Sequence, residues 1–172
     1  LYIDHSPCNF IRKKMKNQKE GELTLLPDEM NTRGLVSLVD RSGIADGQFQ
    51  WLMFYQDQHT KFTHIRALQS NRPTEVGAHL AQIFVIQGAP LLLHTTFGDV
   101  YTTQVLNAVH DIWPVCRIIK SNPISDETSA ELSRAVHDVQ QMLDSWMRQS
   151  NSMNWAAAVP FIMYQHNTVC QS

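Results

Sequence analysis

The chain has 172 residues, of which 43% are hydrophobic and 17% charged, as in an ordinary globular protein. This length predicts one domain with a sizeable buried core. No apolar run approaches the roughly 18 residues that a membrane span needs. The formal net charge of −2 is unlike the strongly basic balance of a dedicated nucleic-acid-binding domain. The three cysteines, Cys8, Cys116 and Cys170, form no disulfide framework, which favours a reducing compartment.

Residues 1–30 are predicted to form an N-terminal arm, and residues 31–172 the folded domain. The arm contains RKKMKNQK at 12–19, which places five positive charges in eight residues. It holds five of the 14 basic and five of the 16 acidic residues, so nine basic and eleven acidic residues remain in the domain. The basic character therefore lies in the arm. Such a run is either a solvated linker or a contact to DNA or to the nuclear import machinery.

Three strand-like runs open the domain. LVSLVD at 35–40 is followed by a loop with two glycines, then by the aromatic run FQWLMFY at 49–55. After the polar turn QDQHT, the run KFTHIRAL at 61–68 alternates between two sets of side chains. The short connections predict three consecutive antiparallel strands.

Helices and strands alternate in the second half. Pro73 and Thr74 suit a helix start and Gly88 its end. A strand at 90–96, a helix at 101–113 and a strand at 115–120 follow, then helices at 126–149 and 154–166. Pro160 should kink or break the last helix. The order β-β-β-α-β-α-β-α-α predicts an α/β domain with a mixed five-stranded sheet and helices on both faces, the order of the ribonuclease-H-like fold.

An ordered series of motifs resembles the integrase catalytic core of Ty3/Gypsy-type retroelements over roughly residues 24–172. NTRGLVSLVDRSGIADGQFQWLMFYQDQHTKF resembles the family's opening strands, and GAPLLLHTTFGDVY lies where the family has GAP-x-x-LQSDNG-x-EF. ISDETSAELSRAVHDVQQMLDSWM resembles HPQSQGSVERAN-x-DVE-x-ML-x-x-WM. The chain is most similar to copies in vertebrate host genes that also carry SCAN or KRAB domains. This implies a domesticated retrotransposon sequence.

The family's chemistry requires two aspartates and a glutamate, which hold two divalent metals about 4 Å apart on a phosphodiester. The resemblance places these acids on three neutral hydroxyl residues, Ser37, Thr96 and Ser133. It therefore implies a pseudoenzyme that has lost its catalytic triad and its metals. A serine hydrolase built on His94 beside Thr96 is a weak alternative, because no His–Asp relay is visible.

The neighbouring acids are poor substitutes for the lost carboxylates. Asp40 is three residues from Ser37 along a strand and should point to the opposite face. Glu131 is two residues from Ser133, about 200° round a helix. Asp99 could reach the site only through its turn. We expect Asp40, Asp57 and Asp99 to be solvated or capping acids.

No metal or other cofactor is expected. In the family a zinc module precedes the core, but here Cys8 has Ile11 at the second cysteine position, and His5 with one cysteine is too few for tetrahedral zinc. The eight histidines show no metal-binding spacing. The four tryptophans should pack the core or an interface.

Two functions from different classes remain open. The first is a non-catalytic interaction module of a nuclear host protein, which forms a homodimer or docks another nuclear protein. Neither function involves a membrane or a small-molecule substrate. The second is a non-catalytic DNA-binding domain. Its contacts would come from the arm and from two residues near the former site: Arg12, Lys13, Lys14, Lys16, Lys19, Lys120 and Arg134.

Overall fold

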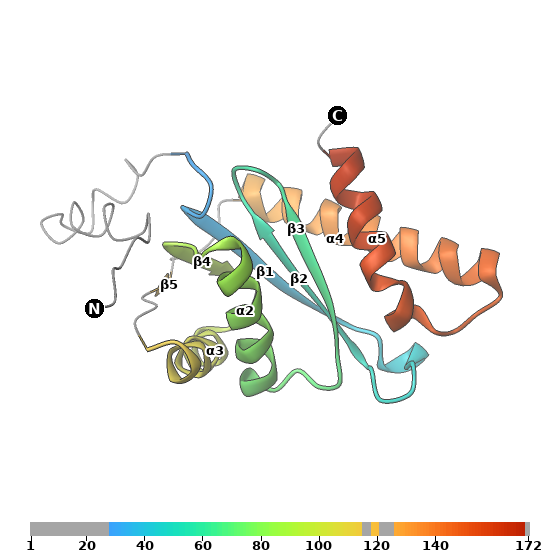
Figure 1. Ribbon diagram of the computed structural model, residues 1–172, viewed down its shortest axis with the longest axis horizontal. Helices are drawn as coiled ribbons and strands as arrows, with labels where there is room; N and C mark the ends of the chain where they lie inside the picture. The colour runs from blue at the N-terminus through green and yellow to red at the C-terminus, as the bar shows by residue number, and fades with distance from the viewer. Residues whose placement is uncertain (1–27, 115–117, 121–125, 171–172) are drawn as a thin grey trace, which may run out of the picture.

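A computed structural model describes residues 28–114, 118–120 and 126–170 (Figure 1). Within these residues the order of elements is the one that the sequence predicts. The elements are β1 (Arg33–Asp40), the short 3-10 helix η2 (Ser42–Ile44), β2 (Trp51–Asp57), β3 (Thr63–Leu68), α2 (Pro73–Gln87), β4 (Leu92–Thr95), α3 (Asp99–Ile112), β5 (Ile119–Lys120), α4 (Asp126–Ser150) and α5 (Trp155–Cys170). No helix in the described part is long and apolar enough to cross a membrane.

The described strands form one mixed sheet in the order β3-β2-β1-β4-β5. β1 lies in the middle, where it pairs antiparallel with β2 and parallel with β4. β2 and β3 form an antiparallel hairpin, and β4 pairs in parallel with the two-residue β5. The α/β class, the mixed five-stranded sheet and the antiparallel opening are therefore confirmed.

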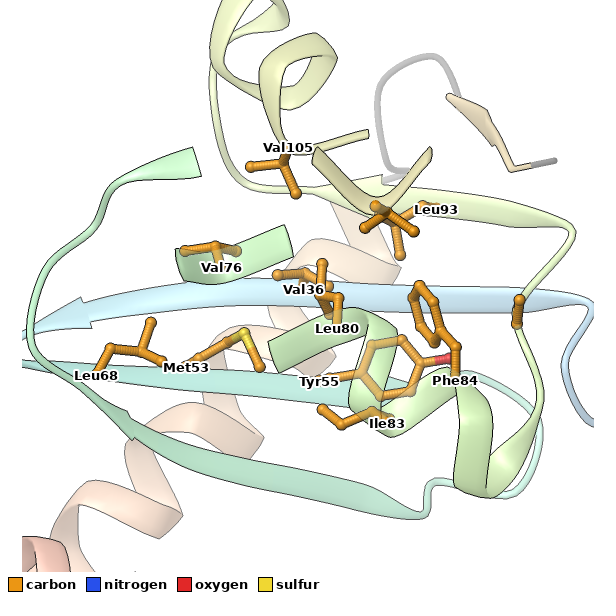
Figure 2. Packing of buried hydrophobic residues seen from close by; sticks show 12 residues of the cluster. Val36, Met53, Tyr55, Leu68, Val76, Leu80, Ile83, Phe84, Leu93 and Val105 are labelled. Atoms are coloured by element: carbon orange, nitrogen blue, oxygen red, sulfur yellow. The ribbon is translucent and has the colours of Figure 1, made fainter. Parts of the chain in front are cut away.

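Helices cover both faces of the sheet, as expected, and each face has its own apolar core. Successive side chains of a strand point to opposite faces. Accordingly, Val36 packs with the core under α2 and α3, whereas Leu35 packs with the core under α4 and α5. Figure 2 shows the first core, in which Leu80 and Phe84 of α2 meet Tyr55 of β2. All four tryptophans join one of the two cores, as predicted, and Trp155 is fully buried.

The observed boundaries differ from the predicted ones mainly at the ends of elements. β2 continues to Asp57, into the segment that we expected to be a turn. α3 begins at Asp99, two residues before its predicted start. Pro160 does not break α5, which continues to Cys170. The proline deprives the carbonyl of Ala156 of its helical donor, but its ring is exposed and leaves the packed side of α5 undisturbed.

α5 also covers the free edge of β3. Thr63 donates its backbone N–H to Oδ1 of Asn167 at 2.8 Å, and Nδ2 of Asn167 donates to the carbonyl oxygen of Thr63 at 2.9 Å. This is the pair of hydrogen bonds that a neighbouring strand would make. The N–H of Ile65 lies 3.5 Å from Sδ of Met163, also on α5. Side chains thus occupy part of an edge that would otherwise be open to another strand.

The approach of α2 to α3 depends on a glycine, which leads to a first prediction. A Cβ on Gly77 would lie 2.6 Å from Cβ of Ala108 and 3.2 Å from the carbonyl oxygen of Val105. We expect Gly77→Ala to lower the free energy of unfolding by about 1–3 kcal/mol, because the two helices must separate. Urea denaturation measures this change.

Gly43→Ala is the matched control, because nothing lies within 4 Å of a Cβ built there. Its expected effect is within about 0.5 kcal/mol. Equal effects of the two substitutions would show that the α2–α3 contact does not require glycine.

Buried histidines lead to a second prediction, on pH. Burial lowers the pKa of His64, His79, His94 and His166 below the ordinary value of 6.5. The unfolded chain therefore binds more protons than the folded chain just below pH 6.5. The stability contributed by these neutral imidazoles is fully present above that pH and is lost as the pH falls toward their folded pKa values.

We expect the free energy of unfolding, measured with urea, to fall between about pH 7.5 and pH 5. Glu75 and Glu131 do not cause a decline in this window. Their pKa values are lowered from an ordinary 4.5, so their contribution is lost only at more acidic pH. A free energy that stays constant or rises on acidification would contradict this prediction.

Candidate functional site

The pairing of β1 with β4 brings together two of the three predicted site residues. Val36 is the register partner of Thr95, and Thr96 donates its backbone N–H to the carbonyl of Val36. Ser37 and Thr96 come next on their strands, and their hydroxyl oxygens lie 3.4 Å apart. Two residues 59 positions apart in sequence thus place neutral oxygens side by side, one within β1 and one just after the end of the parallel β4.

The third predicted residue, Ser133, lies on α4, the helix that covers the same face of the sheet as Ser37. Ser37 follows the alternation of β1 and shares its face with Leu35 and Val39, which pack in the α4–α5 core. The hydroxyl of Ser133 is exposed and donates to the carbonyl of Ser129 at 2.8 Å. The Ser133 hydroxyl is therefore hydrogen-bonded within α4.

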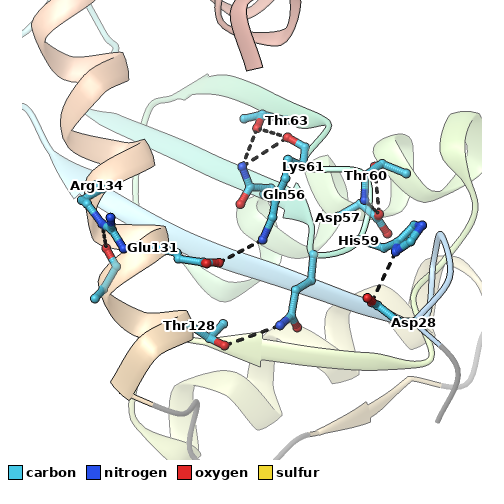
Figure 3. Close-up of polar contacts among 12 residues, drawn as sticks. Asp28, Gln56, Asp57, His59, Thr60, Lys61, Thr63, Thr128, Glu131 and Arg134 are labelled. Carbon is cyan, nitrogen blue, oxygen red and sulfur yellow. Dashed lines mark hydrogen bonds and ion pairs between the residues drawn. The ribbon is translucent and has the colours of Figure 1, made fainter. Parts of the chain in front are cut away.

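Glu131 is held on the other side of α4, as its helical angle predicted. Its carboxylate lies 2.9 Å from Nζ of Lys61 at the tip of the β2–β3 hairpin (Figure 3). Beside this ion pair, Gln58 donates to the hydroxyl of Thr128 at 3.5 Å. Because residues two apart on a helix differ by about 200°, Ser133 faces away from this hairpin. Glu131 cannot take the place of a carboxylate at Ser133.

The other acids also serve local structure. Asp40 accepts a hydrogen bond from the N–H of Ser42 at 2.8 Å, and this bond lowers its pKa. It lies on the face opposite Ser37, as the strand alternation predicted. Asp57 is buried and accepts hydrogen bonds from the N–H groups of Asn31 and Thr60. Asp99 is the first residue of α3. The capping role expected of Asp40 and Asp57 is confirmed.

His94 lies on β4, two residues before Thr96. Burial lowers the pKa of its imidazole, and the positive charge of Arg33 lowers it further. Both ring nitrogens are shielded from water and have no hydrogen-bond partner within the described residues. In the same residues, no three histidine, cysteine, aspartate or glutamate side chains gather closely enough to hold a metal ion. The geometry supplies no carboxylate relay for a serine hydrolase.

The predicted basic contacts are only partly placed. The arm residues Arg12, Lys13, Lys14, Lys16 and Lys19, and the zinc-module remnants His5 and Cys8, lie outside the described residues. Lys120 belongs to the short β5, of which only the backbone is described. Arg134 is exposed on α4, one residue after Ser133, and its Nε donates to the carbonyl of Ala130 (Figure 3).

An exposed apolar face was missed by the sequence analysis. Phe161 and Tyr164 on α5 are 70% and 73% exposed, and Ile86 on α2 is 74% exposed. Ala157, Phe161, Tyr164 and Thr168 follow one another at helical spacing on the side of α5 away from its buried residues. The signal was available: α5 is apolar on nearly all sides, more than one packed face can bury.

α2 and α5 lie on opposite faces of the sheet, and both contact β3 at its edge. We call this region the β3-edge face and define it by Arg66 of β3, whose guanidinium contacts Met163 of α5, and by the neighbouring exposed Tyr164. β2 separates β3 from β1, so this face lies away from the Ser37–Thr96 pair between β1 and β4.

Comparison with known proteins supports the fold. No protein-family profile matches the chain. A human protein, KRAB-A domain-containing protein 2, is 32% identical over 165 residues, which cover 93% of this chain and 33% of the human protein. The chain thus spans about a third of that relative's length. The HTLV-2 integrase catalytic core domain, solved in complex with magnesium in a trimeric form, matches with a TM-score of 0.60. It shares 13% sequence identity, over 81% of this chain and 85% of that one. The chain therefore has the ribonuclease-H-like fold of a retroviral integrase catalytic core.

Proposed function

We propose that this chain is a catalytically inactive, retroelement-derived integrase-like domain that serves as a protein-interaction module in a nuclear host protein. The observation that carries the proposal is the pair of hydroxyls of Ser37, within β1, and Thr96, just after β4, which lie 3.4 Å apart. In the resemblance drawn above, these positions correspond to the two aspartates of the integrase metal site. The two strands bring these two side chains together, and both side chains are neutral.

Neutral hydroxyls are poor ligands for the metals that this chemistry uses. A pair of divalent cations on a phosphodiester is held chiefly by carboxylate oxygens, which supply charge as well as electron pairs. Here Glu131 is bonded to Lys61, and Asp40 to the turn at Ser42. Each nearby acid that could substitute for Ser37 or Ser133 is therefore engaged elsewhere.

The interaction role is supported by the exposed Phe161 and Tyr164 of α5. Exposed aromatic side chains beside one another on a helix are typical of protein contact surfaces. The similar HTLV-2 integrase core was solved in a trimeric form, and the human relative carries a KRAB-A domain in its name. Both are compatible with a domain kept for association in a larger host protein. The basic arm at 12–19 supports a nuclear location.

A gain of metal binding tests the loss of the triad. We expect the triple variant Ser37→Asp, Thr96→Asp, Ser133→Glu to bind Mn²⁺ in isothermal titration calorimetry, because the strand pairing places the first two carboxylates side by side. The natural chain should show no binding under the same conditions. Bound Mn²⁺ should also raise the melting temperature of the triple variant alone.

The matched control is Ser42→Asp, Thr103→Asp, Ser150→Glu, which adds the same charges at three other exposed positions. Equal Mn²⁺ binding by the control would mean that added charge alone explains the effect. Strong binding by the natural chain would overturn the proposal of an inactive site.

Non-catalytic DNA binding is the second candidate, favoured by one observation. Neutral residues at Ser37 and Thr96 remove negative charge from a place where a phosphate would approach, and Arg134 is exposed nearby on α4. If DNA binds, its affinity for the chain should fall steeply with salt, because phosphate contacts release counterions. Fluorescence anisotropy of a labelled duplex at low and near-physiological salt measures this dependence.

Replacing Arg12, Lys13, Lys14, Lys16 and Lys19 together by glutamine separates the arm from the domain. As we favour the interaction module, we expect at most weak, arm-dependent binding that disappears near physiological salt. Binding that persists at that salt and survives the arm substitutions would favour the DNA-binding function instead.

A further inference from the structure

A hollow of about 460 Å³ lies between α4 and α5, where the two helices pack against each other. Three of its lining residues belong to the α4–α5 core and form its apolar base: Met142 and Trp146 of α4, and Ile162 of α5. We call this hollow the α4–α5 groove. Its volume is typical of a cleft that holds a ligand or a short peptide segment.

The sides of the α4–α5 groove are polar. Gln141, Ser145 and Gln149 follow one another at helical spacing on α4, and Gln165 lines the groove from α5. Gln141 is engaged by His137, but the side chains of Gln149 and Gln165 make no hydrogen bond within the described residues. A free carboxamide both donates and accepts hydrogen bonds. The sides therefore suit the N–H and C=O groups of an extended peptide.

Asp138 is the one charged residue among the described residues that line the groove. Its carboxylate is exposed and makes no ion pair within the described part of the chain. Arg134, one turn earlier on α4, donates its Nε to the carbonyl of Ala130 instead. Burial lowers the pKa of the nearby His166, and the charge of Asp138 opposes this shift without reversing it. A neutral His166 leaves the charge of Asp138 unbalanced.

The other end of the groove has the opposite polarity. Arg148 lies ten positions after Asp138 on α4, and its Nη2 donates to the hydroxyl of Ser145 at 3.2 Å. The groove is thus negative at Asp138 and has a positive charge beside its far end. A segment with a single cation at the Asp138 end complements this pattern, whereas a uniformly basic segment would meet Arg148.

The spacing within the groove sets the spacing of a ligand. Asp138 and Trp146 are eight positions apart, which is about 12 Å along the axis of α4. Four residues of an extended peptide cover about 13 Å, and side chains four apart point to the same side. A basic side chain on Asp138 and an apolar side chain on Trp146 therefore belong to residues four positions apart. The aliphatic stem of a lysine would lie on Met142.

We propose that the α4–α5 groove binds an extended segment of a partner protein, with a lysine or arginine on Asp138 and an apolar side chain four residues away on Trp146. This inference rests on the proposed interaction function and names the chemistry of its partner. Two other occupants, the basic arm at 12–19 and a second copy of the chain, are outcomes of the test.

The experiment uses three synthetic peptides with blocked ends and a neutral serine and glycine background. The first has a lysine and a leucine four residues apart. The second carries acetyl-lysine, which removes the charge and keeps the stem. The third has its lysine and leucine three residues apart, so that they point to opposite sides. Each is titrated into the ¹⁵N-labelled chain, and NMR follows the indole signal of Trp146 and the amide signals of α4 and α5.

We expect the first peptide to shift these signals and to bind at least about threefold more tightly than either of the other two. The indole signal of Trp155 serves as an internal reference, because this side chain is fully buried and donates to the carbonyl of Ile44. It should not shift.

A pair of variants tests the role of Asp138. Asp138→Asn should abolish the preference for lysine over acetyl-lysine. Asp111→Asn is the matched control, because Asp111 is exposed near the end of α3, which covers the other face of the sheet. It should leave the preference unchanged. Circular dichroism confirms that both variants are folded.

The inference is overturned if the three peptides bind equally, if none binds, if the shifts fall outside α4 and α5, or if Asp138→Asn keeps the preference. It is also overturned if the first peptide binds only after the arm residues Arg12, Lys13, Lys14, Lys16 and Lys19 are replaced by glutamine, because the arm is then the occupant. A dimer in sedimentation that Asp138→Asn dissociates would make a second copy the occupant and would also overturn it. The Mn²⁺ titration of the triple variant tests the inactive site independently, so a failure with the peptides removes only the role of this groove.

Discussion

The parallel pairing of β1 with β4 determines where the candidate site lies. β1 has hydrogen-bonded neighbours on both sides, so its register is fixed twice, by β2 and by β4. A shift of one residue against β4 would move Thr96 away from Ser37 and turn its side chain to the opposite face. The apolar residues on both faces of β1 oppose such a shift, because Leu35 and Val36 belong to different cores. The position of the two hydroxyls therefore follows from packing that serves the whole domain.

The same sheet separates the candidate site from the β3-edge face. The site lies where β1 meets β4, whereas the β3-edge face lies at the far edge, on the other side of β2. α4 and α5 connect the two regions. α4 is tied to the hairpin tip by Lys61 and Glu131, and α5 is tied to β3 by Asn167. In a domain arranged in this way, the charge between β1 and β4 can change without disturbing the β3 edge. That separation is compatible with the proposed loss of catalysis and the proposed role in association.

The sequence predicted elements well where local patterns determine them, and less well where tertiary contacts do. Alternation around Thr63–Leu68 and the apolar stripe of α4 were sufficient to place those elements. Pro160 was judged too disruptive, because only the structure shows that its ring lies on the exposed side of α5. The juxtaposition of Ser37 and Thr96 was expected from the family resemblance, since no local pattern links residues 59 apart.

An inactive metal site can be checked on the natural chain by titrating Mn²⁺ into the ¹⁵N-labelled domain and following paramagnetic broadening of its amide signals. If Ser37, Thr96 and Ser133 form no metal site, their amides should broaden no more than those of other exposed residues. Selective broadening of these three at low Mn²⁺ concentration would show that the hydroxyls, or an acid brought to them, still hold a metal. The domain would then have to be regarded as a potential enzyme.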